Sequence, residues 1–121
     1  MSAGNYFNTR KQAYDLRTKT ITNLSTYTVK VGSPSDNFVV DAVLKIVTTA
    51  SGNDLTLTVP NGEYSGQRLL LIFDTQGDDE TVTVSVTTGD TVTFDAADEW
   101  VELMWIDNSI GWKKSRYATG V

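Results

Sequence analysis

The chain has 121 residues, no cysteine, no histidine and a formal net charge of -5. This length is typical of one domain. The missing cysteines exclude disulfides, thiolate nucleophiles and cysteine-ligated zinc or iron-sulfur sites. The missing histidines exclude a Ser-His-Asp triad and the most common general base at neutral pH. We therefore predict that the protein is not an enzyme, and we expect neither a cofactor nor a bound metal.

Charge is distributed unevenly along the chain. Residues 1–32 carry a net charge of +4, residues 33–109 carry -12, and residues 110–121 carry +3. An acidic body disfavours nucleic-acid binding, because phosphate contacts depend on clustered Lys and Arg. The same polarity suits contacts between like subunits, or docking of the basic ends on another acidic protein. The alternative is that the basic ends only balance the body for solubility.

The first nineteen residues differ in composition from the rest and predict an N-terminal arm, residues 1–19. Aromatic side chains stand among basic and amide ones, and Asn8 or Thr9 could cap a short helix that runs to Leu16. A helix of this length is marginal alone, so we expect the body or a partner to hold it. The arm residues predicted to contact a partner are Tyr6, Phe7, Arg10, Lys11, Tyr14 and Arg17.

The remaining residues, 20–121, predict one β domain. Thr and Val are frequent, apolar residues alternate with polar ones, and turn residues recur at the intervals of sandwiches and barrels. The expected fold class is all-β, a single β-sandwich or jelly-roll-like domain of about eight strands with an extended or short-helical arm. The expected strands are residues 20–31, 38–49, 55–59, 67–73, 82–86, 92–94, 100–106 and 112–117.

An acidic segment, residues 74–80, is the best candidate metal site. Calcium binds several oxygen ligands from a flexible loop, and Asp74, Asp78, Asp79 and Glu80 would supply carboxylates. The spacing of a known calcium-binding loop is absent. We therefore favour a solvated hairpin loop and predict no metal.

Two further groups of residues could carry chemistry. Glu99 and Glu102 are three residues apart, so on a regular strand they face opposite sides and cannot flank one glycosidic bond. Trp100, Trp105 and Trp112 could stack against a sugar. Because Trp100 and Trp105 also face opposite sides of a strand, at least one of them should lie in the core.

A short run near the C-terminus, residues 112–117, interleaves basic and aromatic side chains. Single-strand nucleic-acid binders use this combination, but the run is short and the body is acidic. We therefore expect these residues to contact a protein. The predicted contact residues are Trp112, Lys113, Lys114, Arg116 and Tyr117.

Residues 59–114 contain the segments VPNGEYSGQRLLLIFD, TVTVSV and TVTFDAADEWVELMWIDNSIGWKK. These segments resemble a β module that recurs in virion proteins of tailed bacteriophages, including capsid decoration proteins and tail or fibre-associated proteins. The motif consists of turn and core residues and contains no catalytic group. The matching positions are Gly62, Gly66, Gln67, Thr93, Phe94, Asp95, Ala96, Trp105, Gly111 and Trp112.

This resemblance implies a structural component of a virion, made in the host cytoplasm because residues 1–10 lack the apolar stretch of a signal peptide. We expect a capsid decoration or cement protein that bridges major capsid subunits as a homo-oligomer, either a trimer or a dimer. Its partner would be the major capsid protein or another virion protein, with no nucleic acid and no membrane. One alternative is a tail, baseplate or fibre-associated protein, and another is a carbohydrate-binding adhesion module.

Overall fold

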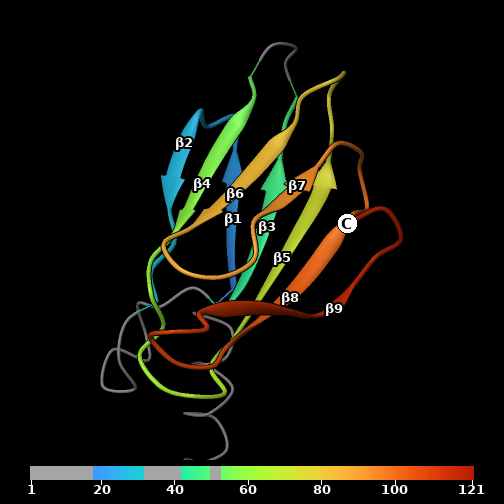
Figure 1. Ribbon diagram of the computed structural model, residues 1–121. Coiled ribbons are helices and arrows are strands. Elements are labelled where there is room, and N and C mark those ends of the chain that lie inside the picture. The colour runs from blue at the N-terminus through green and yellow to red at the C-terminus, as the bar shows by residue number, and fades with distance from the viewer. Residues whose placement is uncertain (1–17, 32–41, 50–52) are drawn as a thin grey trace, which may run out of the picture.

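The computed structural model describes residues 18–31, 42–49 and 53–121 of the chain. These residues form nine β-strands and no helix (Figure 1). The strands are β1 (Thr18–Thr22), β2 (Thr26–Thr28), β3 (Val43–Val47), β4 (Leu55–Val59), β5 (Arg68–Thr75), β6 (Val82–Val86), β7 (Val92–Phe94), β8 (Trp100–Trp105) and β9 (Trp112–Tyr117).

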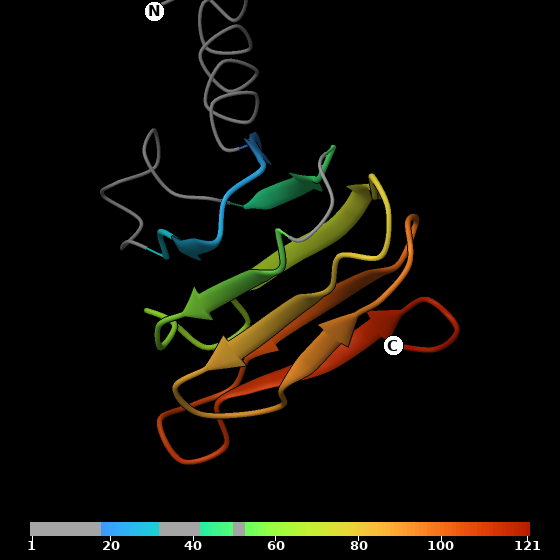
Figure 2. The same cartoon turned by 90° about the horizontal axis from the view of Figure 1, so that it is seen from above.

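The strands form two sheets that pack face to face, as Figure 2 shows from above. Sheet A has five strands in the order β1-β3-β5-β8-β9, and sheet B has four in the order β2-β4-β6-β7. Two packed sheets without a helix in the described residues confirm the predicted all-β sandwich.

The chain winds through the two sheets as a regular coil, and each turn of this coil contains one strand of each sheet. Successive strands alternate between the sheets as far as β6, so β1, β3 and β5 are parallel in sheet A and β2, β4 and β6 are parallel in sheet B. Parallel neighbours need a long crossover connection, and here each crossover contains the strand of the opposite sheet. Thr18 pairs with Val43 and Val43 with Leu70, so one turn of the coil takes 25 and then 27 residues.

The last three strands end this coil by reversing direction. β7 pairs antiparallel with β6, β8 with β5, and β9 with β8. The predicted strands 100–106 and 112–117 are β8 and β9, which form a hairpin. A jelly roll is built from antiparallel Greek keys, so the parallel coil distinguishes this sandwich from one.

The segment predicted as one strand, residues 20–31, is two strands in different sheets. The chain bends after β1 at Asn23, whose φ of 54° lies in the left-handed region that Asn tolerates better than most residues. The Asn23 side chain holds the bend: its Nδ2 donates to Thr49 Oγ1 at 2.6 Å and its Oδ1 accepts from Thr49 N at 2.8 Å. The prediction of a single strand here is wrong.

Other boundaries differ less from the sequence expectation. β5 continues to Thr75, two residues beyond its predicted end, and β1 includes Thr18 and Lys19, the last two residues of the predicted arm. The other arm residues, 1–17, and the start of the predicted strand 38–49 lie outside the described residues.

Alternation along the strands places the hydrophobic core between the sheets. In β4, Leu55, Leu57 and Val59 are buried while Thr56 and Thr58 are exposed. Each fully buried side chain of this size contributes about 1.5–3 kcal/mol to folding. The core residues are Ile21, Val29, Val31, Leu44, Ile46, Leu55, Leu57, Val59, Leu69, Leu71, Phe73, Val82, Val84, Val92, Phe94, Val101, Leu103, Trp105 and Trp112.

Two buried tryptophans pack against each other in this core. The rings of Trp105 and Trp112 meet edge to face, with their centroids 5.5 Å apart. Trp112 Nε1 donates to the carbonyl oxygen of Pro60 at 2.8 Å, so the buried indole N–H is satisfied. A Cβ on Gly62 would overlap the Trp105 ring, which explains the glycine at this position.

The turn that leads into β9 gives a test of this packing. Gly111 has a φ of +81°, and a Cβ there would overlap the carbonyl oxygen of Thr88. Gly66 has a similar φ of +87°, with nothing within 4 Å of the position of a Cβ. Gly66→Ala should therefore cost only the backbone strain, about 1–2 kcal/mol. Gly111→Ala should cost roughly 1–3 kcal/mol more, because the clash adds to the strain.

Urea unfolding of both variants beside the wild type measures this difference. Equal destabilisation by the two substitutions would contradict the close packing of Gly111 against Thr88.

Candidate functional site

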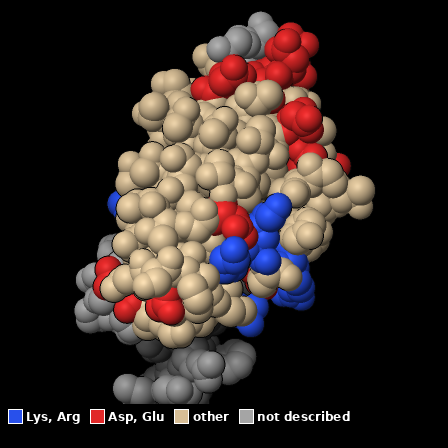
Figure 3. Space-filling view, in the orientation of Figure 1, with Lys and Arg blue, Asp and Glu red and all other residues tan. Residues whose placement is uncertain are grey.

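The outer face of sheet B is covered with hydroxyl groups. Exposed Thr26, Thr56, Thr83 and Thr93 lie in register across its four strands. None of these four strands contains a charged residue. In Figure 3, acidic side chains gather at the upper end of the visible face, with others at its lower left, and basic ones lie toward its lower right, while the middle of the face is largely uncharged.

The outer face of sheet A is apolar in its centre. Leu70 and Ile72 of β5 lie in register with Glu102 and Trp100 of β8. Leu70, Ile72 and Trp100 are half-buried in the single chain, and Val43 of β3 continues the apolar surface beside them. β5 is therefore apolar on both of its faces, although only one of them faces the core.

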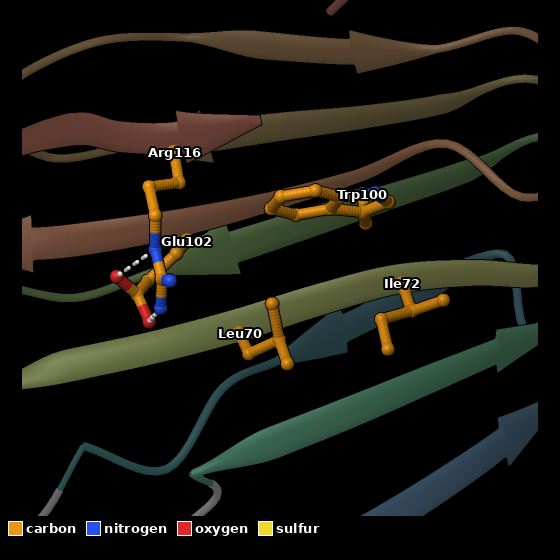
Figure 4. Close-up of a pocket in the computed structure, with 5 residues that line it drawn as sticks. All are labelled: Leu70, Ile72, Trp100, Glu102 and Arg116. Carbon is orange, nitrogen blue, oxygen red and sulfur yellow. Dashed lines mark hydrogen bonds and ion pairs between the residues drawn. The ribbon is translucent and has the colours of Figure 1, made fainter. Parts of the chain in front are cut away.

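Two adjoining hollows mark this outer face. One has a volume of about 320 Å³ and is lined by Leu70, Ile72, Trp100, Glu102 and Arg116, whose side chains surround it in Figure 4. The other has a volume of about 410 Å³, shares Leu70 and Glu102 with the first, and reaches Arg68 and Val43. Together they form one shallow groove across β3, β5, β8 and β9.

Glu102 is the polar centre of the groove. Its carboxylate accepts hydrogen bonds from Arg68 at 2.7 Å, from Arg116 at 3.3 Å on one oxygen and 3.1 Å on the other, and from the Ser115 hydroxyl at 2.9 Å. The Glu102 side chain is only 11% exposed, whereas those of Arg68 and Arg116 are 55% and 71% exposed. One buried carboxylate therefore anchors two guanidinium groups that reach the surface.

This arrangement holds Glu102 in its charged form. The hydrogen bond from Arg116 lowers the pKa of Glu102 most strongly, burial opposes it, and Ser115 and the charges of Arg116 and Arg68 lower it further. The net result is a pKa below the ordinary value. Glu102 in turn raises the pKa of Arg116.

The C-terminal residues predicted to contact a partner lie on β9, at one edge of sheet A. Lys113 pairs with Asp90 at 3.0 Å, Lys114 lies 4.9 Å from the centre of the Tyr117 ring, and Tyr117 is 53% exposed. Trp112 differs, because it is completely buried in the core of its own chain and its ring is not available to a partner. The charged side chains on this edge also discourage pairing with a strand of another molecule.

The six arm residues predicted to contact a partner, Tyr6, Phe7, Arg10, Lys11, Tyr14 and Arg17, lie outside the described residues.

The tryptophans follow the predicted parity. Trp105 is in the core and Trp100 is on the outer face of the same strand.

Glu99 and Glu102 make different contacts. Glu99 Oε1 accepts from the backbone amides of Asp95 and Ala96 in the loop before β8, whereas Glu102 lies in the groove.

The acidic loop between β5 and β6 crosses from one sheet to the other, so it is not a hairpin. Asp78 and Asp79 are exposed, as expected of a solvated loop, but Glu80 is completely buried. The solvated-loop prediction is wrong for Glu80. One carboxylate oxygen from each of these three residues lies within 4.8 Å of the others, and Asp74 is not part of this cluster.

The central residues of the groove, Leu70 and Ile72, are not among the site residues predicted from the sequence. Alternation along the predicted strand 67–73 places Leu69, Leu71 and Phe73 on one face and gives no role to Leu70 and Ile72. The continuous apolar run from Leu69 to Phe73 was the available signal, because a half-exposed strand normally alternates with polar residues.

Comparison of the sequence with protein-family models matches no family, and comparison with curated proteins finds no match. Within the described residues, no helix has the length and apolar character needed to cross a membrane.

The ion network around Glu102 predicts a pH-dependent contribution to stability. A carboxyl whose pKa is lowered by folding stabilises the protein above its unfolded pKa, near 4.5, and loses this effect as the pH falls through the folded value. Glu102→Gln should therefore lower the free energy of unfolding by about 1–2 kcal/mol at neutral pH, a modest cost because both guanidinium groups are largely exposed. The difference from wild type should disappear in strong acid.

Urea unfolding of wild type and Glu102→Gln at several pH values measures this effect. Glu63→Gln, at an exposed position in the turn before β5, is the matched control and should change stability little. Equal stability of wild type and Glu102→Gln at neutral pH would refute a stabilising network.

Proposed function

We propose that the protein is a structural component of a bacteriophage virion and that it works by packing the outer face of sheet A against another subunit. The observation that carries this proposal is the apolar centre of the groove, Leu70, Ile72 and Trp100, which the single chain leaves partly open to solvent. Contiguous apolar surface on a small protein commonly marks a site of protein association.

The assignment to a phage particle rests on the sequence resemblance. The positions that carry it are architectural: Gln67, Phe94, Trp105 and Trp112 are buried, and Gly111 has the left-handed conformation of a turn. The resemblance therefore supports a shared fold more strongly than a shared location in the particle. Within a virion, a capsid decoration or cement protein that bridges major capsid subunits is the leading role, and a tail, baseplate or fibre component is the alternative.

The groove is suited to packing against a second copy of the chain. Arg68 and Asp74 lie toward opposite ends of β5, and both are exposed. In a two-fold arrangement about the apolar centre, the basic end of each copy would lie near the acidic end of the other. The charges of the two copies would then be complementary, and their apolar centres would pack against each other. This arrangement favours a homo-oligomer.

Substitution of the groove tests this association. Ile72→Asp should dissociate the oligomer, because it buries a charge in an apolar contact, while leaving the fold intact, since the side chain faces away from the core. Thr58→Asp, an outward substitution on sheet B, is the matched control and should leave the oligomer unchanged. Size-exclusion chromatography with light scattering measures the mass, and circular dichroism checks the fold.

A wild-type protein that is monomeric at micromolar concentration would overturn the homo-oligomer proposal. If the wild type is oligomeric and Ile72→Asp has the same oligomer mass, the groove is not part of the interface.

A carbohydrate-binding module has weaker support. Two of the three tryptophans, Trp105 and Trp112, are buried, so Trp100 is the only tryptophan that could stack against a sugar. Trp100 fluorescence that responds to a glycan, and a loss of the response in Trp100→Ala, would favour this module over the packing interface.

Electron microscopy of the native particle that contains this chain tests its location. The decoration role predicts density between capsid subunits over the whole shell, whereas density confined to the tail would establish the alternative. Particles assembled without the protein should be less resistant to heat and internal pressure, and equal resistance would refute a stabilising role.

A further inference from the structure

Glu80 is a buried carboxylate with unsatisfied oxygens. Its side chain is completely buried, and neither Oε1 nor Oε2 has a hydrogen-bond partner. Glu102, the other buried acidic residue in the described part of the chain, has four such bonds by comparison. Burying a charge without a partner costs folding free energy. The two oxygens of Glu80 are therefore expected to bind a cation or a hydrogen-bond donor.

The surroundings of Glu80 keep it ionised. Burial raises its pKa, but the backbone amides of Glu80, Asp78 and Gly77 and the hydroxyl of Thr48 together lower it below the ordinary value. None of these groups donates a hydrogen bond of ordinary distance and angle to either oxygen. The loop therefore favours the charged form of the Glu80 carboxylate.

Two exposed carboxylates complete the cluster. Asp78 and Asp79 each place a carboxylate oxygen within 4.8 Å of that of Glu80. No ion pair among the described residues neutralises any of the three. Acidic side chains gather at the upper end of the molecule in Figure 3, where Figure 1 places the loop between β5 and β6. Three uncompensated negative charges in so small a space repel one another unless a cation lies between them.

We propose that Asp78, Asp79 and Glu80 bind a calcium ion. All the donors are oxygens, which suits a hard cation and excludes the nitrogen and sulfur ligands that transition metals prefer. Three carboxylates on a short loop, two of them open to water, fit the irregular coordination that calcium accepts better than the strict octahedron of magnesium. This site is separate from the groove on sheet A and does not depend on the proposed function.

The ion would stabilise the crossover between the sheets. The loop joins β5 of sheet A to β6 of sheet B, and it is tied to the preceding turn of the coil, where Gly77 N donates to Thr48 Oγ1 at 3.2 Å. Thr48 N in turn donates to the carbonyl oxygen of Thr75 at 2.8 Å. Calcium should therefore raise the thermal stability of the whole domain, because it binds the folded chain and not the unfolded one.

Calcium titration of the full chain, after removal of metal with a chelator, tests the proposal. Isothermal calorimetry should show one calcium ion per chain, and the midpoint of thermal unfolding should rise with calcium concentration. Asp78→Asn and Asp79→Asn should each weaken binding at least about tenfold. Because both side chains are exposed, both variants should fold. Glu80→Gln should weaken binding as well, and the two aspartate variants keep the test decisive if it does not fold.

Asp95→Asn is the matched control, because Asp95 is exposed and lies outside the cluster, and its carbonyl oxygen accepts from Gln76 Nε2 of the same loop at 2.9 Å. It should retain wild-type affinity. A loss of affinity as large as that of Asp78→Asn would show that general electrostatic attraction, and not direct ligation, holds the cation. That result would overturn the site. No calcium-dependent heat at about 1 mM would overturn it as well, and equal affinity for magnesium would overturn the assignment to calcium.

Discussion

Backbone pairing between successive turns of the coil is the constraint on which the rest of the structure depends. A strand of sheet A finds its parallel neighbour only after the chain has passed through sheet B and returned, so each turn sets the register of the next. That register stacks equivalent positions into columns, such as Ile21, Ile46 and Phe73. The column that points inward becomes core, and the columns that point outward become the two surfaces.

Three surface features follow from this arrangement. Sheet B presents its hydroxyl rows, sheet A presents the groove, and one end of the coil carries the acidic loop. The groove exists because β5 and β8 are neighbouring interior strands of sheet A and carry apolar residues on both faces. Arg68 and Arg116 come from the strands on either side of β8, so the ion network around Glu102 also depends on strand order.

Much of the local structure could be predicted from the sequence, because alternation determines which face a side chain occupies. The strands 55–59, 82–86 and 92–94, and the opposite placement of Trp100 and Trp105, follow from this pattern. Alternation does not specify which strand lies next to which, so parallel pairing could not be deduced from it. A recurring Thr-x-Thr or Thr-x-Ser pattern at 26–28, 56–58 and 83–85, with an interval near 27–30 residues, was the signal of a repeating coil. The burial of Glu80 depends on contacts between distant segments and has no local signature.

The stacking of equivalent turns gives the fold an adjustable length. In a coil of this kind each turn pairs only with its neighbours. A further turn of about 27 residues could therefore pair with an existing turn in the same way as the present turns pair with one another. Each added turn would extend both sheets by about 4.8 Å and leave the antiparallel closure at β7, β8 and β9 unchanged. The sandwich can therefore lengthen only in steps of one whole turn, each of which adds one strand to each sheet.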